Sequence, residues 1–228
     1  MNFLSWRPLW IFLFSDVVVF VSHFLLGPKL GFFHLEKEGN LGSFQAGIKF
    51  WLAAIAVCLS AWILSRVESA KSRWIIILLV CAGIGLAYIG LDDMMAIHER
   101  AGFVINNLLG KGGFYGESFN WLLYFSPLVV LALGVFTRLL FWFRKKHPSV
   151  FYLFLIGVVL CVFSLGAEWL GGKMIVGPDL NVTRYRQLIL LEEAFEMVGG
   201  SFLAAALFTL LSRLTAVHVR VLKEDQLV

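Results

Sequence analysis

The chain has 228 residues, of which 60% are hydrophobic and 15% are charged, and its formal net charge at pH 7 is +4. Its mean hydropathy of +0.84 lies far above that of soluble domains. This composition excludes a soluble enzyme, and the small positive charge gives no case for nucleic-acid binding. We therefore expect a multi-pass protein of the cell membrane.

Six apolar stretches are long enough to cross the hydrocarbon core as helices, which takes about 20 residues each. They are residues 9–26, 44–64, 74–97, 119–143, 150–169 and 187–211. The loops between them are short, so residues 1–228 are expected to form a single all-α domain, a transmembrane bundle of six helices. The first stretch is long enough to be a span itself, which argues against a separate signal peptide.

Lys and Arg in short loops favour the cytoplasmic side of a membrane. If the N-terminus is cytoplasmic, eleven of the nineteen basic residues lie inside. These eleven are Arg7, Arg66, Lys71, Arg73, Arg138, Arg144, Lys145, Lys146, Arg213, Arg220 and Lys223. The other eight are Lys29, Lys37, Lys49, Arg100, Lys111, Lys173, Arg184 and Arg186. The bias predicts that both termini lie inside, with six spans between them.

Acidic residues and histidines interrupt the apolar stretches at ends that share one face of the membrane. Because successive helices alternate in direction, residues late in the third and fifth spans lie beside residues early in the sixth. The residues on that face are Asp92, Asp93, His98, Glu99, Glu168, Glu192, Glu193 and Glu196, with His23 at the end of the first span. Charged groups this close to hydrocarbon are costly and usually mark a functional site.

Helical geometry brings several of these side chains together. In a continuous third helix, Asp92 and Glu99 are seven residues apart and lie within about 20° of each other. Asp93 and His98 then flank that stripe on opposite sides.

The sixth span and the first span carry similar groupings. Glu192, Glu193 and Glu196 occupy one arc of about 100° on the sixth helix. Asp16 and His23 are seven residues apart on the first helix, and so share a face. We expect all these faces to converge.

Several carboxylates within about 4–6 Å of one another at low dielectric cannot all stay ionised without compensation. A divalent cation can bind among them, some of them can hold and relay protons, or nearby arginines can pair with them. The candidate ion-pair partners are Arg100, Arg184 and Arg186.

Imidazole together with carboxylates is the ligand set of zinc and of non-haem iron or manganese. The expected metal ligands are Asp92, Glu99, Glu192 and Glu196. The expected catalytic acid–base groups are Glu168 and His98. Further candidates for the site are Asp93, Glu193, His23 and Asp16. Neither a Glu-x-x-His pair nor HExxH occurs, so the spacing does not select one metal.

Two segments, LDDMMAIHE and LLEEAFEMVG, resemble parts of uncharacterised bacterial multispanning membrane proteins. In those proteins the third helix ends in an LD[DE]xxxxHE motif and the last helix carries paired glutamates. The two segments cover about a tenth of this chain. The resemblance implies a polytopic protein of unknown activity, and proteins of this kind are sometimes loosely called transporters. A bacterial inner membrane is the expected location.

Three functions from different classes remain open. The first is a metal-dependent enzyme acting on a lipid-like substrate. The second is proton or cation transport through the same carboxylates. The third is a structural or accessory membrane subunit held together by an ion-pair network. We favour the first.

The expected partners follow from this interpretation. They are the lipid bilayer and a lipid-like substrate. A homo-oligomer is also compatible with the sequence, because a bundle of this size can form half of a dimeric site. The segment KGGFYG lacks the strand and helix that a phosphate loop needs, so no nucleotide is expected.

Overall fold

The computed structural model describes residues 6–27, 29–33, 35, 40–67, 73–108, 121–176 and 181–225. These residues form seven α-helices, a single turn of 3-10 helix and no strand. In chain order the elements are α1 (Arg7–Leu26), η2 (Gly31–Phe33), α2 (Leu41–Val67), α3 (Arg73–Met95), α4 (Ile97–Leu108), α5 (Trp121–Lys146), α6 (Pro148–Val176) and α7 (Val182–Asp225). Of the basic residues used for the orientation, Lys37, Lys71 and Lys111 lie outside the described residues.

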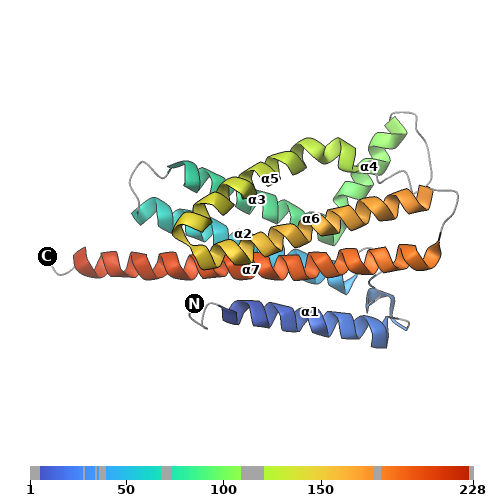
Figure 1. Cartoon of the computed structure of the whole chain (residues 1–228), viewed down its shortest axis with the longest axis horizontal. Helices are drawn as coiled ribbons and strands as arrows, with labels where there is room; N and C mark the ends of the chain where they lie inside the picture. The colour runs from blue at the N-terminus through green and yellow to red at the C-terminus, as the bar shows by residue number, and fades with distance from the viewer. Residues whose placement is uncertain are drawn as a thin grey trace.

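Six of the helices, all except α4, are long and apolar enough to cross a membrane. They alternate in direction, and α1 begins and α7 ends at the same end of the bundle (Figure 1). The predicted all-α multi-pass bundle is therefore confirmed. Which side of the membrane holds the termini stays a prediction.

α7 is much longer than the predicted span of residues 187–211. Its 44 residues extend for about 66 Å at about 1.5 Å each, roughly twice the hydrocarbon thickness. Figure 1 shows its C-terminal part reaching beyond the other helices. Hydropathy detects only the apolar part of such a helix. The helix starts earlier because residues 182–198 contain neither glycine nor proline.

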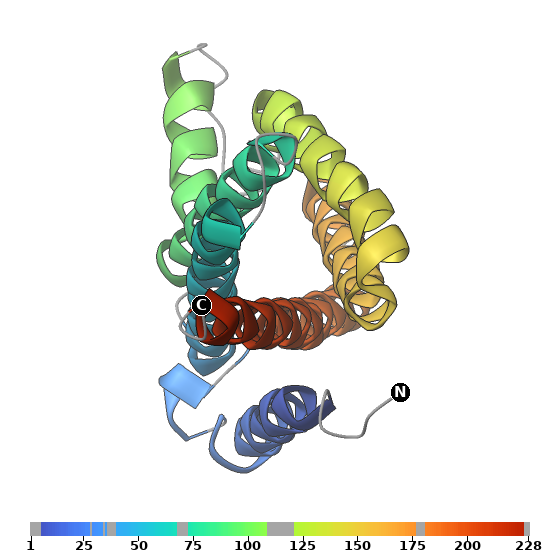
Figure 2. The same cartoon turned by 90° about the vertical axis from the view of Figure 1, so that its left-hand side faces the viewer.

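The third predicted span is broken. α3 ends at Met95, Ala96 adopts a left-handed φ of 48°, and α4 starts at Ile97. Viewed along the bundle, α4 projects away from the other helices (Figure 2). The expectation that Asp92 and Glu99 share one helical stripe was therefore wrong, since Glu99 belongs to the first turn of a separate helix.

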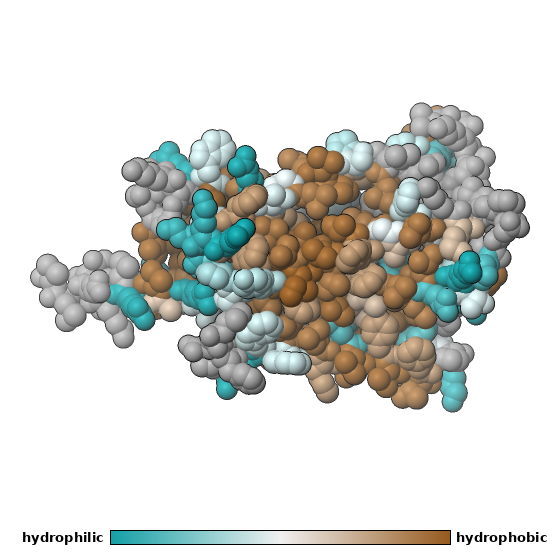
Figure 3. Space-filling view, in the orientation of Figure 1, coloured by the Kyte–Doolittle hydropathy of each residue, from teal (hydrophilic) through white to brown (hydrophobic). Residues whose placement is uncertain are grey.

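The core of the bundle is built around α2 and α7. In each of these helices 61% of the most apolar window is buried, against 22% in α1 and 11% in α5. In Figure 2, α1 lies outside the bundle on the far side of α7. The outward faces are apolar, and a broad hydrophobic surface separates two hydrophilic ends in Figure 3. The protein therefore contacts the lipid bilayer through these faces.

Small residues allow α2 and α3 to approach closely. A Cβ atom added to Gly47 or to Gly90 would meet the carbonyl oxygen of the other glycine at 2.6 Å. α6 and α7 meet in the same way, since a Cβ on Gly157 would lie 2.7 Å from Leu203. Close backbone contact is a common source of helix association in membranes.

We expect Gly90→Ala to destabilise the bundle, because its methyl group meets the backbone of α2 and the helices must separate. Overpacking of this kind typically costs about 1–3 kcal/mol. The matched control is Gly85→Ala on the same helix, where the added Cβ has nothing within 4 Å. Thermal unfolding of the detergent-purified variants measures the difference, and equal melting temperatures for the two variants would contradict the close contact.

Candidate functional site

His98 joins α4 to two acids of the bundle. Its Nδ1 lies 2.8 Å from Oδ2 of Asp92 on α3, and its Nε2 lies 3.3 Å from Oε1 of Glu168 on α6. The backbone N–H of His98 also donates to Oδ1 of Asp92 at 2.7 Å. Asp92 thus caps the start of α4 and orients the imidazole ring, and the break between α3 and α4 at Ala96 makes both contacts possible.

The electrostatics of His98 follow from these contacts. Burial opposes a charged ring, but hydrogen bonds and charge interactions with Asp92 and Glu168 outweigh burial and raise the pKa of His98 to about 11. At neutral pH the ring is therefore an imidazolium, held between the two acidic side chains.

Glu196 on α7 and Asp93 on α3 add two more acids to the same region. Ser164 on α6 donates a hydrogen bond to Oε1 of Glu196 at 3.1 Å. Glu196 also interacts with the charges of Glu168 and His98, and it shares a hydrogen bond with Asp93. Oδ2 of Asp93 is buried and has no hydrogen-bond partner among the described residues.

Five of the candidate residues therefore meet at the α4 end of the bundle, and we call them the acid–imidazole cluster. They are Asp92, Asp93, His98, Glu168 and Glu196.

Glu193 lies on the same arc of α7 as Glu196 but contacts Asn40, the residue before α2. Nδ2 of Asn40 donates to Oε1 of Glu193 at 2.9 Å. Oδ1 of Asn40 in turn accepts the N–H groups of Gly42 and Ser43, at 2.5 and 3.0 Å, and so caps the N-terminus of α2. A carboxylate beside a helix N-terminus is favourable. Glu193 thus fixes α7 against the start of α2.

The other candidate residues lie in several places. Glu99 and Glu192 are half-buried. Nδ1 of His23 accepts the backbone N–H of Leu35 at 3.1 Å, a contact that fixes the segment after α1.

Pairing of the acids with the three predicted arginines stays a prediction. Arg100, Arg184 and Arg186 occupy exposed positions. The buried acids with described contacts meet His98, Lys49, serine and asparagine side chains instead.

Asp16 belongs to a second polar group deeper in the bundle. It forms an ion pair with Lys49 on α2 and accepts a hydrogen bond from Ser201 on α7 at 2.6 Å. Nζ of Lys49 also donates to the carbonyl oxygen of Met197 at 3.2 Å. Lys49 is 2% exposed and Asp16 is 3% exposed, so this ion pair is withdrawn from both lipid and water.

Lys49 is the functional candidate that the sequence interpretation missed. We assigned it to the outer group of basic residues, and this was wrong because α2 begins at Leu41 and carries Lys49 into the core. The available signal was its position inside the apolar stretch 44–64, whose residues after Lys49 are all uncharged. Such a lysine needs an acid on a neighbouring helix.

Lys49 also connects the two polar groups. The charge of Asp93 acts on Lys49, and the carbonyl that Lys49 contacts belongs to the residue after Glu196. Polar side chains thus extend from His98 at one end of the bundle to Asp16 on α1.

A complete metal site is not assembled in the part of the chain that the structure describes. No three His, Cys, Asp or Glu side chains there are arranged to hold an ion together. Within the acid–imidazole cluster, Nε2 of His98 and Oε1 of Glu168 are a pair of donor atoms at short range.

Comparison with known proteins gives a family but no activity. Residues 12–210 match the family described as Domain of unknown function (DUF8692). The match includes every residue of the acid–imidazole cluster as well as Asp16 and Lys49. No curated protein and no solved structure matches the sequence.

We expect Lys49→Met and Asp16→Asn each to destabilise the protein by about 3–5 kcal/mol, because each leaves one buried charge without its counter-ion. The double variant removes both charges and is expected to recover most of that loss. Unfolding of the purified variants in a denaturing detergent measures the three free energies. Additive losses in the double variant would be incompatible with a buried ion pair.

Proposed function

For this chain, which belongs to the DUF8692 family, we propose that the acid–imidazole cluster binds a divalent metal ion and uses it in chemistry on a lipid-like substrate. Zinc, iron and manganese are the candidate metals. The observation that carries the proposal is the position of His98, whose ring nitrogens face Asp92 on one side and Glu168 on the other.

The distances around His98 suit a metal. Two ligand atoms about 2.1 Å from a tetrahedral ion are separated by about 3.4 Å. Nε2 of His98 and Oε1 of Glu168 are 3.3 Å apart, so an ion that displaces the Nε2 proton of the imidazolium fits between them.

Asp92 supports the same interpretation. It accepts the hydrogen bond of Nδ1, as the carboxylate does in carboxylate–histidine–metal triads, where it orients the ring and increases its basicity. His98 and Glu168, first assigned acid–base roles, thus become the primary ligands, and Asp92 orients His98.

Asp93 and Glu196 complete the proposal. They are further acids close to the pair, and one of them supplies a third ligand after a change of side-chain rotamer. Neighbouring carboxyl groups are also suited to acid–base catalysis. A bound divalent ion supplies Lewis-acid activation of a carbonyl or phosphoryl oxygen, or of water.

The surroundings of the cluster favour a lipid-like substrate. Glu168 and Glu196 lie in helices long and apolar enough to cross the membrane, and the neighbouring apolar residues Trp169, Leu170 and Leu191 are 46–49% exposed. A molecule that reaches the cluster between these helices passes through an apolar environment.

The acid–imidazole cluster and the Asp16–Lys49 pair lie in one half of the bundle, which favours a one-sided site over transport. The buried residues that follow Ser201 on α7 include the apolar run 203–207. Ser60 and Thr209 in that half donate to carbonyl groups of their own helices. A proton path across the membrane needs exchangeable groups in both halves.

Metal content of the purified protein tests the proposal. We expect about one equivalent of zinc, iron or manganese in the wild type after reloading, and loss of this metal in His98→Gln and Glu168→Gln. Asp92→Asn is expected to lower the affinity about 10–100-fold without abolishing binding, because Asp92 acts only through the ring of His98.

The control is His147→Gln, at the opposite end of the bundle between α5 and α6. Size-exclusion profiles establish that each variant is folded. Equal metal content in His98→Gln and His147→Gln, or no metal in the reloaded wild type, would refute the metal site. Incubation of metal-loaded and chelator-treated protein with a phospholipid and isoprenoid extract, followed by mass spectrometry, then tests for metal-dependent products.

A further inference from the structure

A cavity of about 190 Å³ lies on the outside of the bundle, at the end opposite α4. It is lined by Thr137, Leu140, Phe141 and Arg144 of α5 and by Phe151 of α6. The four residues of α5 follow a helical spacing of three and four, so they form one stripe along the helix. Most of the lining is apolar, and Arg144 is the one charged residue in it.

This end of the bundle carries a strong positive potential. Arg144, Lys145 and Lys146 form the last turn of α5. Burial, together with the charges of Arg213 and Lys146, lowers the pKa of His147, which follows directly.

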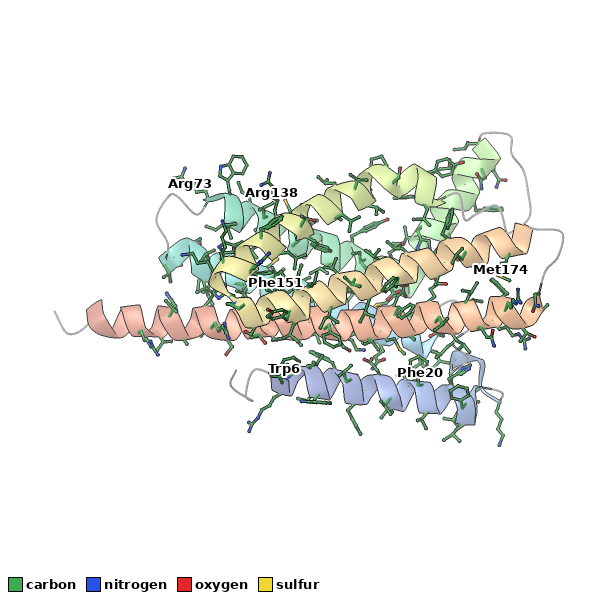
Figure 4. The ribbon with its side chains drawn as sticks, in the orientation of Figure 1. Trp6, Phe20, Arg73, Arg138, Phe151 and Met174 are labelled. Atoms are coloured by element: carbon green, nitrogen blue, oxygen red, sulfur yellow. The ribbon has the colours of Figure 1, made fainter. Side chains whose placement is uncertain are left out.

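Further basic residues lie at this end of the bundle. Figure 4 labels Arg73 and Arg138 at the same end of the bundle as Phe151. Hydrophilic residues gather over this end in Figure 3.

A simpler role for these cations exists, because basic residues in a last turn complement the helix dipole and set membrane orientation. Lys145 and Lys146 satisfy both roles, and they do not line the cavity. Arg144 differs because it lines an apolar surface, which a role in orientation does not require.

We propose that this cavity binds an anionic phospholipid, whose acyl chain lies along Leu140, Phe141 and Phe151 and whose phosphate contacts Arg144. A soluble anion uses the arginine and leaves the aromatic walls in contact with bilayer lipid. A neutral lipid uses the walls and leaves the cation without an anionic partner. An anion attached to an acyl chain matches both, as in basic pockets between transmembrane helices. This site is independent of the acid–imidazole cluster.

Native mass spectrometry of the full chain in detergent tests the proposal, with phosphatidylglycerol and phosphatidylcholine of identical acyl chains as probes. We expect the wild type to retain phosphatidylglycerol about fivefold more strongly, the factor for one cationic headgroup contact. Arg144→Gln is expected to lose this preference. The matched control, Arg138→Gln, alters an exposed arginine of the same helix that does not line the cavity, and should keep it.

A second variant tests the cavity itself. Thr137 is exposed on the helix surface, so Thr137→Trp fills the space without disturbing the core. It should weaken retention of both lipids and leave the melting temperature in lipid-free detergent unchanged. Equal losses in Arg144→Gln and Arg138→Gln, or undiminished retention in Thr137→Trp, would overturn the proposal.

Discussion

Charge buried within a membrane must be compensated by a polar partner on a neighbouring helix, and α7 takes part in several of these contacts. Glu193 contacts the start of α2, and Glu196 contacts Ser164 of α6 and Asp93 of α3. One turn further on, Ser201 holds Asp16 of α1. These three side chains of α7 thus meet different neighbouring helices. An uncompensated charge at any of these contacts costs several kcal/mol, on the order of 3–5, so the contacts help to determine how the helices pack.

The sequence predicts the spans and the common face because both depend on local or topological rules. Apolar length identifies the membrane-crossing helices. Alternating direction places the ends of α3 and α6 beside the start of α7. The break after α3 is not predictable in this way, since the segment from Leu91 to Arg100 contains neither glycine nor proline. The break depends on Asp92, which lies six residues before His98 and accepts its backbone N–H at the start of α4. It also depends on the left-handed conformation of Ala96, which the packed structure maintains.

The sequence also leaves the partners of individual acids open. Glu193 and Glu196 lie on one arc of the same helix, yet Glu193 contacts Asn40, the residue that caps α2, and Glu196 faces α3 and α6. Periodicity gives the direction of a side chain around its own helix but not the identity of the helix that it meets. The same limit explains Lys49, which a count of loop charges placed outside and which the packing of α1 against α2 and α7 buries.

Lys49 links the acid–imidazole cluster electrostatically to Asp16, since the charges of both Asp16 and Asp93 act on it. α1 buries little of its surface, so its attachment depends strongly on the ion pair between Asp16 and Lys49. The same ammonium group experiences the charge of Asp93, which shares a hydrogen bond with Glu196. Any change of charge in the acid–imidazole cluster therefore changes the electrostatic balance at Lys49. Because interactions at low dielectric are weakly screened, the position of α1 and the charge state of the cluster are energetically coupled.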